Sequence, residues 1–179
     1  NLDIISSNDL LFTAEITLAK IKDREFVLKS KLKSLDTQYD FIIFDCSPSL
    51  SLLNQNAIMA SDELVIPTAL EHLSLRGLTQ LLRNLKVLTE NFEHPIAITA
   101  IVPTFVDKRK KITTELFEQL KKTFPSTPVC PIRISNDLNQ AISNQQTIFE
   151  YAPKSTGSID YKILAKEVIN VWIKKRKTH

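Results

Sequence analysis

The apolar run from Phe41 to Phe44, which ends at Asp45, constrains the fold of this chain more than any other stretch. Its side chains are bulky or β-branched and none is polar, which is typical of a strand buried on both faces of a parallel sheet. In open α/β sheets, ligands bind in the crevice outside the carboxyl ends of such strands. We therefore expect Asp45 at a ligand site, although an aspartate after a strand is also a common turn former or helix cap.

Strand and helix patterns alternate along the rest of the chain. Pro67 and Pro103 are expected to end two of the strands. The alternation predicts an α/β fold with a doubly wound, mostly parallel sheet and helices on both faces. No linker or repeat divides residues 1–179, so one domain is predicted. The expected strands cover residues 2–5, 41–44, 63–67, 96–102 and 129–134, and the expected helices cover residues 10–35, 49–59, 75–91, 113–124 and 158–172.

The composition narrows the possible functions. With 43% hydrophobic and 24% charged residues, the sequence has the balance of a soluble globular protein. No apolar stretch approaches the ~18 residues that span a bilayer, so a cytoplasmic protein without membrane contact is predicted. Cys46 and Cys130 keep no metal-ligand spacing, and reduced thiols are expected. Glycine occurs only at Gly77 and Gly157, so the sequence contains no glycine-rich phosphate-binding loop.

Basic residues cluster although the net charge is only +3. Such clusters suggest a polyanionic partner, with a solvated helix face or tail as the commoner alternative. The clustered residues are Lys108, Arg109, Lys110, Lys111, Lys121, Lys122, Lys174, Lys175, Arg176 and Lys177.

Several segments together resemble one family. The phrase Tyr39-Asp-Phe-Ile-Ile-Phe-Asp-Cys-Ser-Pro-Ser49 is similar to the Walker B segment, Y-D-Y-I-I-I-D-C-P-P-S, of the ParA-type partition ATPases, which are relatives of MinD in the deviant-Walker-A group of P-loop proteins. The resemblance covers almost the whole chain with motifs in the same order. The other matching segments are Leu2–Asn8, Ala60–Pro67, Glu71–Leu78, Thr104–Arg109, Leu138–Ala141 and Phe149–Gly157.

The sequence also departs from the family. The family's K-G-G-x-G-K-[ST] loop lies upstream of the segment that Leu2–Asn8 resembles, together with its first helix and second strand, and this chain contains none of these. We expect a C-terminal portion of a longer protein, with a natural short form as the alternative. Ser47 replaces a proline, His72 an aromatic residue, and Arg133 the proline of the usual I-P-R-N.

The resemblance implies roles for particular residues. Asp45 is expected to act in catalysis by holding Mg²⁺ through a bound water. Thr104 and Arg109 are expected to line the nucleotide or the dimer face. Arg133, Ser135 and Asn136 are expected to line the pocket for the base, with ordinary loop polarity as the alternative. The cofactors would be ATP and Mg²⁺, and both need the missing loop. The chain alone is therefore expected to bind ATP weakly and not to hydrolyse it.

The resemblance further implies a DNA-partition ATPase of plasmids or chromosomes, located at the nucleoid. Such a protein would form a homodimer on ATP, bind DNA without sequence preference and be stimulated by a ParB-like partner. We expect the last helix to pack beside the helix after Thr113, so that the basic runs share one DNA-binding face. One alternative is a non-catalytic DNA- or partner-binding module of the same fold. Another is a cysteine hydrolase that uses Cys46 with His72 or His94.

Overall fold

The computed structural model describes residues 2–35 and 38–176. The described residues form two compact units. The N-terminal unit comprises Asn1–Asp62 and His94–Ile96, and the sheet unit comprises Glu63–Glu93 and Ala97–His179. The organisation of residues 1–179 as one domain stays a prediction. Five side chains inside the described ranges are not characterised, and they belong to Phe12, His72, Leu73, Lys175 and Arg176.

The sheet unit is built on two parallel strands. Strand β1 (Glu63–Ala69) pairs with β2 (Ala97–Thr104) over their whole length, with one register irregularity between Leu64 and Val65. The segment after residue 128 extends this sheet on the other side of β2, through parallel bridges from Ile101 to Val129 and from Val106 to Arg133. Backbone hydrogen bonds of 2.8–3.2 Å continue the pairing as far as Ile134. The prediction of a parallel α/β sheet is confirmed.

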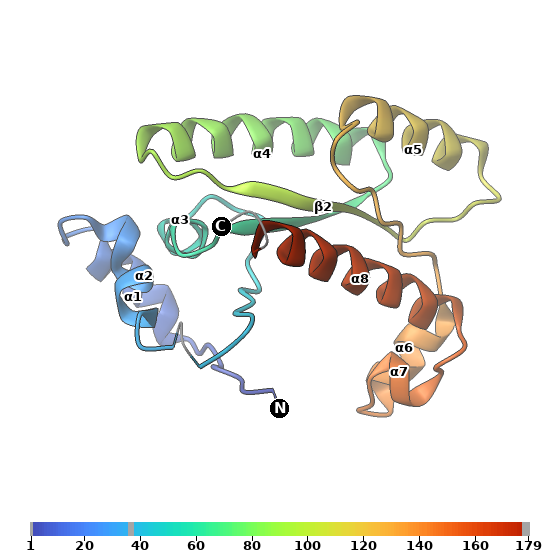
Figure 1. Cartoon of the computed structure of the whole chain (residues 1–179), viewed down its shortest axis with the longest axis horizontal. Helices are drawn as coiled ribbons and strands as arrows, with labels where there is room; N and C mark the ends of the chain where they lie inside the picture. The colour runs from blue at the N-terminus through green and yellow to red at the C-terminus, as the bar shows by residue number, and fades with distance from the viewer. Residues whose placement is uncertain (1, 36–37, 177–179) are drawn as a thin grey trace. The chain divides into compact units, whose positions relative to one another are not determined.

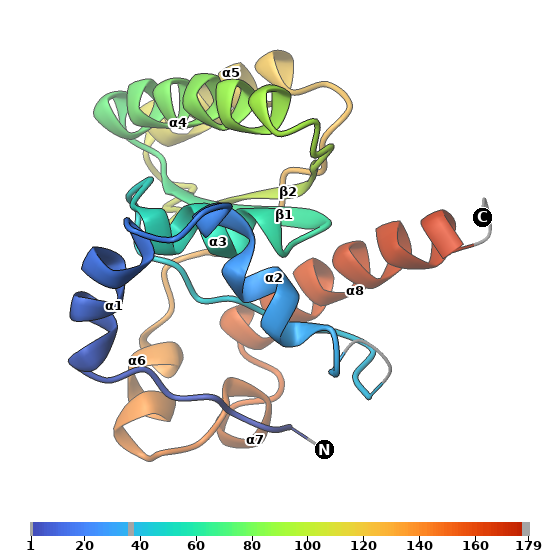
Figure 2. The ribbon, with the colours of Figure 1, turned by 90° about the vertical axis from the view of Figure 1, so that its left-hand side faces the viewer.

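Helices cover both faces of this sheet (Figures 1 and 2). Helices α4 (His72–Asn91) and α5 (Lys111–Thr123) lie on one face, and α8 (Thr156–Arg176) lies on the other. Strand β2 supplies both cores, because successive side chains of a strand point to opposite faces. Ile101 packs with Ile66, Leu78 and Leu120 on the first face. Ala100, Val102, Cys130 and Ile132 pack with Leu138 and Leu164 on the second.

Two short helices separate the third strand-like segment from α8. They are α6 (Asn136–Ser143) and α7 (Ile148–Tyr151), and the sequence patterns did not predict them. A capping box starts α7: the Thr147 hydroxyl accepts from the Glu150 backbone N–H, while the Glu150 carboxylate accepts from the Thr147 N–H. Such a helix has four residues, too few for a helical hydrophobic period to show in the sequence.

The N-terminal unit is helical. It contains α1 (Leu10–Leu18), a 3₁₀ turn η1 (Arg24–Phe26), α2 (Val27–Leu32) and α3 (Leu52–Met59). The single helix expected over residues 10–35 is wrong, because Asp23 adopts a left-handed backbone conformation with φ of 54° and interrupts it. The helix expected from residue 49 to Met59 is confirmed, with Ser51 as its N-cap.

The strands expected at residues 2–5 and 41–44 are absent. Both segments lack regular secondary structure, and Ile43 is 89% exposed and Ile5 84% exposed. A strand exists only where a neighbouring strand accepts its backbone hydrogen bonds, and no described residue pairs with either segment in that way. The two proline boundaries were also misplaced. Strand β1 continues through Pro67 to Ala69, and β2 continues through Pro103 to Thr104.

Candidate functional site

Asp45 directly follows the apolar segment 41–44 in the N-terminal unit. Its side chain is exposed, and within the described part of the chain it makes no hydrogen bond or ion pair. Asp45 is not a helix cap, because Ser51 caps the next helix by accepting from the Asn54 N–H at 3.4 Å. Mg²⁺ is commonly bound by carboxylates, and it keeps several of its water molecules when it is bound. The side chain therefore fits the metal-holding role expected from the sequence.

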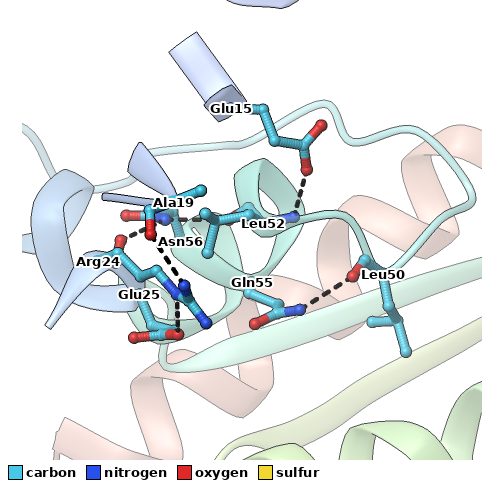
Figure 3. Close-up of polar contacts among 8 residues, drawn as sticks. All are labelled: Glu15, Ala19, Arg24, Glu25, Leu50, Leu52, Gln55 and Asn56. Carbon is cyan, nitrogen blue, oxygen red and sulfur yellow. Dashed lines mark hydrogen bonds and ion pairs between the residues drawn. The ribbon is translucent and has the colours of Figure 1, made fainter. Parts of the chain in front are cut away.

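Polar contacts surround the first turns of α3, the helix that follows the loop with Asp45 (Figure 3). The Leu52 N–H donates to Glu15 Oε1 at 2.6 Å, which joins α1 to the first turn of α3. The buried Asn56 amide donates to the Arg24 carbonyl at 2.8 Å. Its oxygen accepts from the Leu28 N–H at 3.0 Å. These contacts fix α3, η1 and α2 to one another, so the loop that carries Asp45 enters a well-anchored helix.

Thr104 and Arg109 lie at the carboxyl edge of the sheet, as expected. Thr104 is the last residue of β2, and its hydroxyl donates to the Thr68 carbonyl at 3.5 Å. Arg109 is exposed, but its guanidinium is paired with Asp107 through two hydrogen bonds of 2.9 Å. The hydrogen bonds from the Arg109 side chain and backbone lower the pKa of Asp107 to about 2. The pair joins two residues of the loop after β2.

Arg133 has a partner that the sequence did not reveal. Its guanidinium makes hydrogen bonds of 2.6–3.1 Å to both carboxylate oxygens of Asp160, and its backbone N–H donates to Asp160 Oδ2 at 2.9 Å. Asp160 is buried in the first turns of α8. Burial raises the pKa of its carboxyl, but the hydrogen bonds from Arg133 outweigh burial and leave the pKa lowered. Arg133 thus ties the third strand-like segment to α8.

Ser135 and Asn136 follow Arg133 at the same edge of the sheet. Ser135 stands at the N-cap position of α6 without capping it, and its buried Oγ has no hydrogen-bond partner among the described residues. Asn136 begins α6 and is exposed. The structure therefore gathers the predicted residues of the sheet unit along one edge. Asp45 belongs to the N-terminal unit.

Sequence reasoning missed Asp107 and Asp160 as partners of the two arginines. Asp107 had a local signal, because it lies two residues before Arg109 in the T-x-x-D-x-R segment, where a short loop lets the two side chains meet. Asp160 had none, since it is 27 residues away from Arg133 in the chain.

The basic runs do not share one face. Lys108–Lys111 surround the start of α5, and Lys121 and Lys122 lie in its last turn. Lys174 is near the end of α8, on the opposite face of the sheet (Figures 1 and 2). The packing of α8 beside α5 was therefore a wrong prediction: Leu120 of α5 and Leu164 of α8 belong to different cores. The Lys175 and Arg176 side chains and Lys177 lie outside the described residues.

Some of the lysines have local partners. Lys111 is 3.7 Å from Glu115, and Lys121 is 3.6 Å from Glu118 while also lying over the Phe117 ring. These exposed ion pairs are weak and leave the ammonium groups accessible.

Cys46 does not have the surroundings of a nucleophile. Partial desolvation and the neighbouring Asp45 carboxylate raise the pKa of its thiol, whereas a reactive cysteine needs a lowered pKa. His94 is engaged elsewhere, with Nε2 2.9 Å from the Ser61 carbonyl oxygen. The His72 side chain lies outside the described residues. The described residues also contain no cluster of three or more metal-ligating side chains and no helix long and apolar enough to cross a membrane.

Comparisons with known proteins identify the family. A family model described as an AAA domain matches residues 1–98. The chain is 37% identical over 171 residues to the sporulation initiation inhibitor protein Soj of Bacillus subtilis, covering 94% of this chain and 67% of Soj. It is 32% identical to the cell division protein PomZ of Myxococcus xanthus, with 94% of this chain and 53% of PomZ covered.

A solved structure agrees with these relatives. Cobyrinic acid a,c-diamide synthase from Mycobacterium smegmatis, with bound ADP and magnesium, matches with a TM-score of 0.76 and 27% identity over 96% of this chain and 63% of that one. The chain thus spans about half to two thirds of the length of these proteins. The family model, which covers more than half of the chain, and these relatives show that the chain belongs to the ParA-type family of partition ATPases.

Proposed function

We propose that this chain is part of a DNA-partition ATPase that dimerises on ATP, binds DNA without sequence preference and hydrolyses ATP faster when a ParB-like partner binds. The observation that carries the proposal is the exposed Asp45 carboxylate, which has no partner among the described residues of a chain that belongs to this family. An acidic side chain left open at such a position has no structural task in the N-terminal unit. It is available to a magnesium ion and its waters.

The proposal gives Asp45 a role toward magnesium and, separately, gives residues at the carboxyl edge of the sheet a role toward the nucleotide. Mg²⁺, when bound, would neutralise charge on the nucleotide phosphates. Asp45 would hold it by accepting hydrogen bonds from its bound water. Thr104 and Asn136 would contact the nucleotide, together with Ser135, whose buried hydroxyl lacks a partner among the described residues. Arg109 and Arg133 would act through the segments that they hold, because Asp107 and Asp160 occupy their guanidinium groups.

The basic runs are the proposed DNA contacts, and they do not share one face. Each phosphate that a lysine or arginine neutralises adds about −0.9 to the slope of log affinity against log salt concentration, so about four contacts per subunit give a slope of about −3.6. Charge reversal at Lys174–Lys177 should flatten this slope in the ATP-bound complete protein. Reversal at Lys108–Lys111 is the companion variant. Binding that keeps the wild-type salt slope in both variants would show that these runs are only solvated surface.

One experiment separates this function from a non-catalytic module of the same fold. Steady-state ATP hydrolysis is measured with Mg²⁺, DNA and a ParB-like partner for the complete protein that carries the phosphate-binding loop, and for residues 1–179 alone. We expect turnover by the complete protein and none by residues 1–179, whose sequence offers no glycine-rich loop. A complete protein that binds DNA but never hydrolyses ATP would support the non-catalytic module. Turnover by residues 1–179 alone would contradict the proposed need for the loop.

A further inference from the structure

A single buried side chain holds the loop that follows Asp45. Asn54, on the first turn of α3, is 8% exposed. Its Nδ2 donates to the Ser47 carbonyl at 2.7 Å and also to the Ser49 carbonyl. The Ser47 and Ser49 hydroxyls lie 3.1 and 3.3 Å from the same nitrogen, and 3.1 Å from each other. The loop itself is exposed and has no regular secondary structure.

The chemistry of the contacts requires an amide at this position. The nearest neighbours of Asn54 Nδ2 are two carbonyl oxygens, which only accept hydrogen bonds, and an amide NH₂ has two hydrogens to give. One side chain thereby closes both ends of the Ser47-Pro48-Ser49 segment. A carboxylate of the same size would place its oxygens against these carbonyls and donate nothing, so the loop would lose both anchors.

The anchor acts on Asp45 through the backbone. Only Cys46 separates Asp45 from Ser47, and consecutive Cα atoms are about 3.8 Å apart, so the anchored carbonyl lies within about 8 Å of the Asp45 Cα along the chain. The Asp45 side chain makes no hydrogen bond or ion pair of its own among the described residues. The direction of its carboxylate therefore depends on how the following loop is held.

We propose that Asn54 is a positioning residue for Asp45: by fixing the Ser47 and Ser49 carbonyls it orients the carboxylate toward magnesium. This inference rests on the proposed function, because it assumes that Asp45 holds the ion. Groups that orient a metal-binding side chain commonly alter metal affinity 10–100-fold when they are changed. Loss of the Asn54 amide should accordingly weaken magnesium binding without removing any metal-binding atom.

Two substitutions and a neighbouring control test the proposal in the complete protein. Asn54→Asp keeps the size of the side chain and removes both donors, whereas Asn54→Gln keeps the amide and displaces it by one methylene group. Gln55→Ala is the matched control, because the Gln55 amide lies on the same helix and also anchors a loop carbonyl, that of Leu50 at 3.0 Å, but farther from Asp45 (Figure 3). Nucleotide-dependent Mn²⁺ binding, followed by electron paramagnetic resonance, gives the metal affinity. Amide hydrogen exchange of residues 46–50 gives the order of the loop.

We expect the Mn²⁺ dissociation constant to rise about 10-fold or more in Asn54→Asp. It should rise less in Asn54→Gln and stay within about twofold in Gln55→Ala, while exchange in residues 46–50 accelerates in the same order. A merely structural role would lower the folded fraction but leave the Mn²⁺ dissociation constant of the folded protein unchanged. Wild-type metal affinity in Asn54→Asp, or an equal shift in Gln55→Ala, would overturn the inference.

The exchange measurement separates failure of the inference from failure of the proposed function. If the unaltered complete protein binds no metal with nucleotide, the proposed function fails and the role of Asn54 toward magnesium fails with it. If the unaltered protein binds metal while Asn54→Asp leaves both loop exchange and metal affinity unchanged, the function stands and the inference alone is wrong.

Discussion

The two units of the molecule are stabilised in different ways. The sheet unit buries apolar side chains on both faces of β2, with Ile101 and Ala100 fully inaccessible to solvent. In the described part of the N-terminal unit, the buried residues all lie on α3, and two of them are asparagines: Asn54, Asn56, Ala57 and Met59. Apolar side chains therefore dominate the interior of the sheet unit, whereas asparagine amides make up half of the buried residues described in the N-terminal unit. Ile43, in the apolar segment before Asp45, contributes little to either, because its side chain is 89% exposed.

This difference matters for the site. Apolar packing tolerates exchanges of similar shape, whereas a buried amide has to satisfy particular donors and acceptors. The residues proposed to bind nucleotide on the sheet edge stand on a packed scaffold. Asp45 instead depends on directional polar contacts in the loop and helix that follow it.

The largest effect is expected from the core of the sheet unit. Ile101→Ala removes a completely buried side chain between β1, α4 and α5 and should lower the free energy of unfolding by about 2–5 kcal/mol. Urea denaturation followed by circular dichroism measures the change. A loss below about 1 kcal/mol would show that β2 is not packed as described, and the comparison between the units would fail.

The second-largest loss of unfolding free energy is expected when the ion pair of Arg133 and Asp160 is broken. Arg133→Met leaves a carboxylate that is only 6% exposed without its guanidinium partner, and the expected loss is about 3 kcal/mol. Lys111→Met is the control, because it breaks an exposed ion pair and should cost less than about 0.5 kcal/mol. The double variant Arg133→Met with Asp160→Asn should be more stable than Arg133→Met alone. Equal stability of these two variants would show that no buried charge had been stranded.

The pH dependence of stability should report on the two pairs of arginine and aspartate. The folded pKa of Asp107 is about 2, below its ordinary value of 3.8, so its contribution to stability is present above about pH 4 and is lost as the pH falls through 2. Asp160 behaves in the same direction, because its pKa is also lowered. The carboxyl ¹³C shift of Asp107 should titrate with a midpoint of about 2. In Arg109→Ala the midpoint should return toward 3.8, and an unchanged midpoint would contradict the pairing.

The smallest effect is expected in the N-terminal unit. Ile43→Ala makes the same substitution as Ile101→Ala, but at a side chain that is 89% exposed. The free energy of unfolding should change by no more than about 0.5 kcal/mol. Denaturation under the conditions used for Ile101→Ala gives a direct comparison. A loss of several kcal/mol would show that Ile43 is buried and that segment 41–44 is packed as the sequence predicted.

The sequence predicts the sheet unit well because its elements carry their own periodicity. Leu78 and Leu85 lie on the apolar stripe of α4 and are buried, as the helical spacing indicates. The apolar segment 41–44 carries an equally clear strand pattern, but a strand also needs a neighbour to accept its hydrogen bonds. The pattern therefore predicts the environment that the segment prefers, and the described residues do not supply it.

The candidate site was predictable to a similar extent. The placement of Thr104, Arg109, Ser135 and Asn136 at one sheet edge follows from the topology of parallel strands. The partner of Arg133 and the anchoring role of Asn54 could not be predicted, because each depends on which polar atoms meet after folding. Asn54 in particular has the sequence context of an ordinary helix residue.

The central claim is that Asp45 is the magnesium-holding acid of a partition ATPase. Its most direct test is Mg²⁺-dependent ATP turnover by the complete protein, compared between Asp45→Ala and Asp40→Ala. Asp40 is the matched control, because it is also exposed and precedes the same apolar segment. We expect both variants to keep the circular dichroism spectrum of the unaltered protein, with turnover abolished in Asp45→Ala and retained in Asp40→Ala. Unaltered turnover in Asp45→Ala would contradict the assignment.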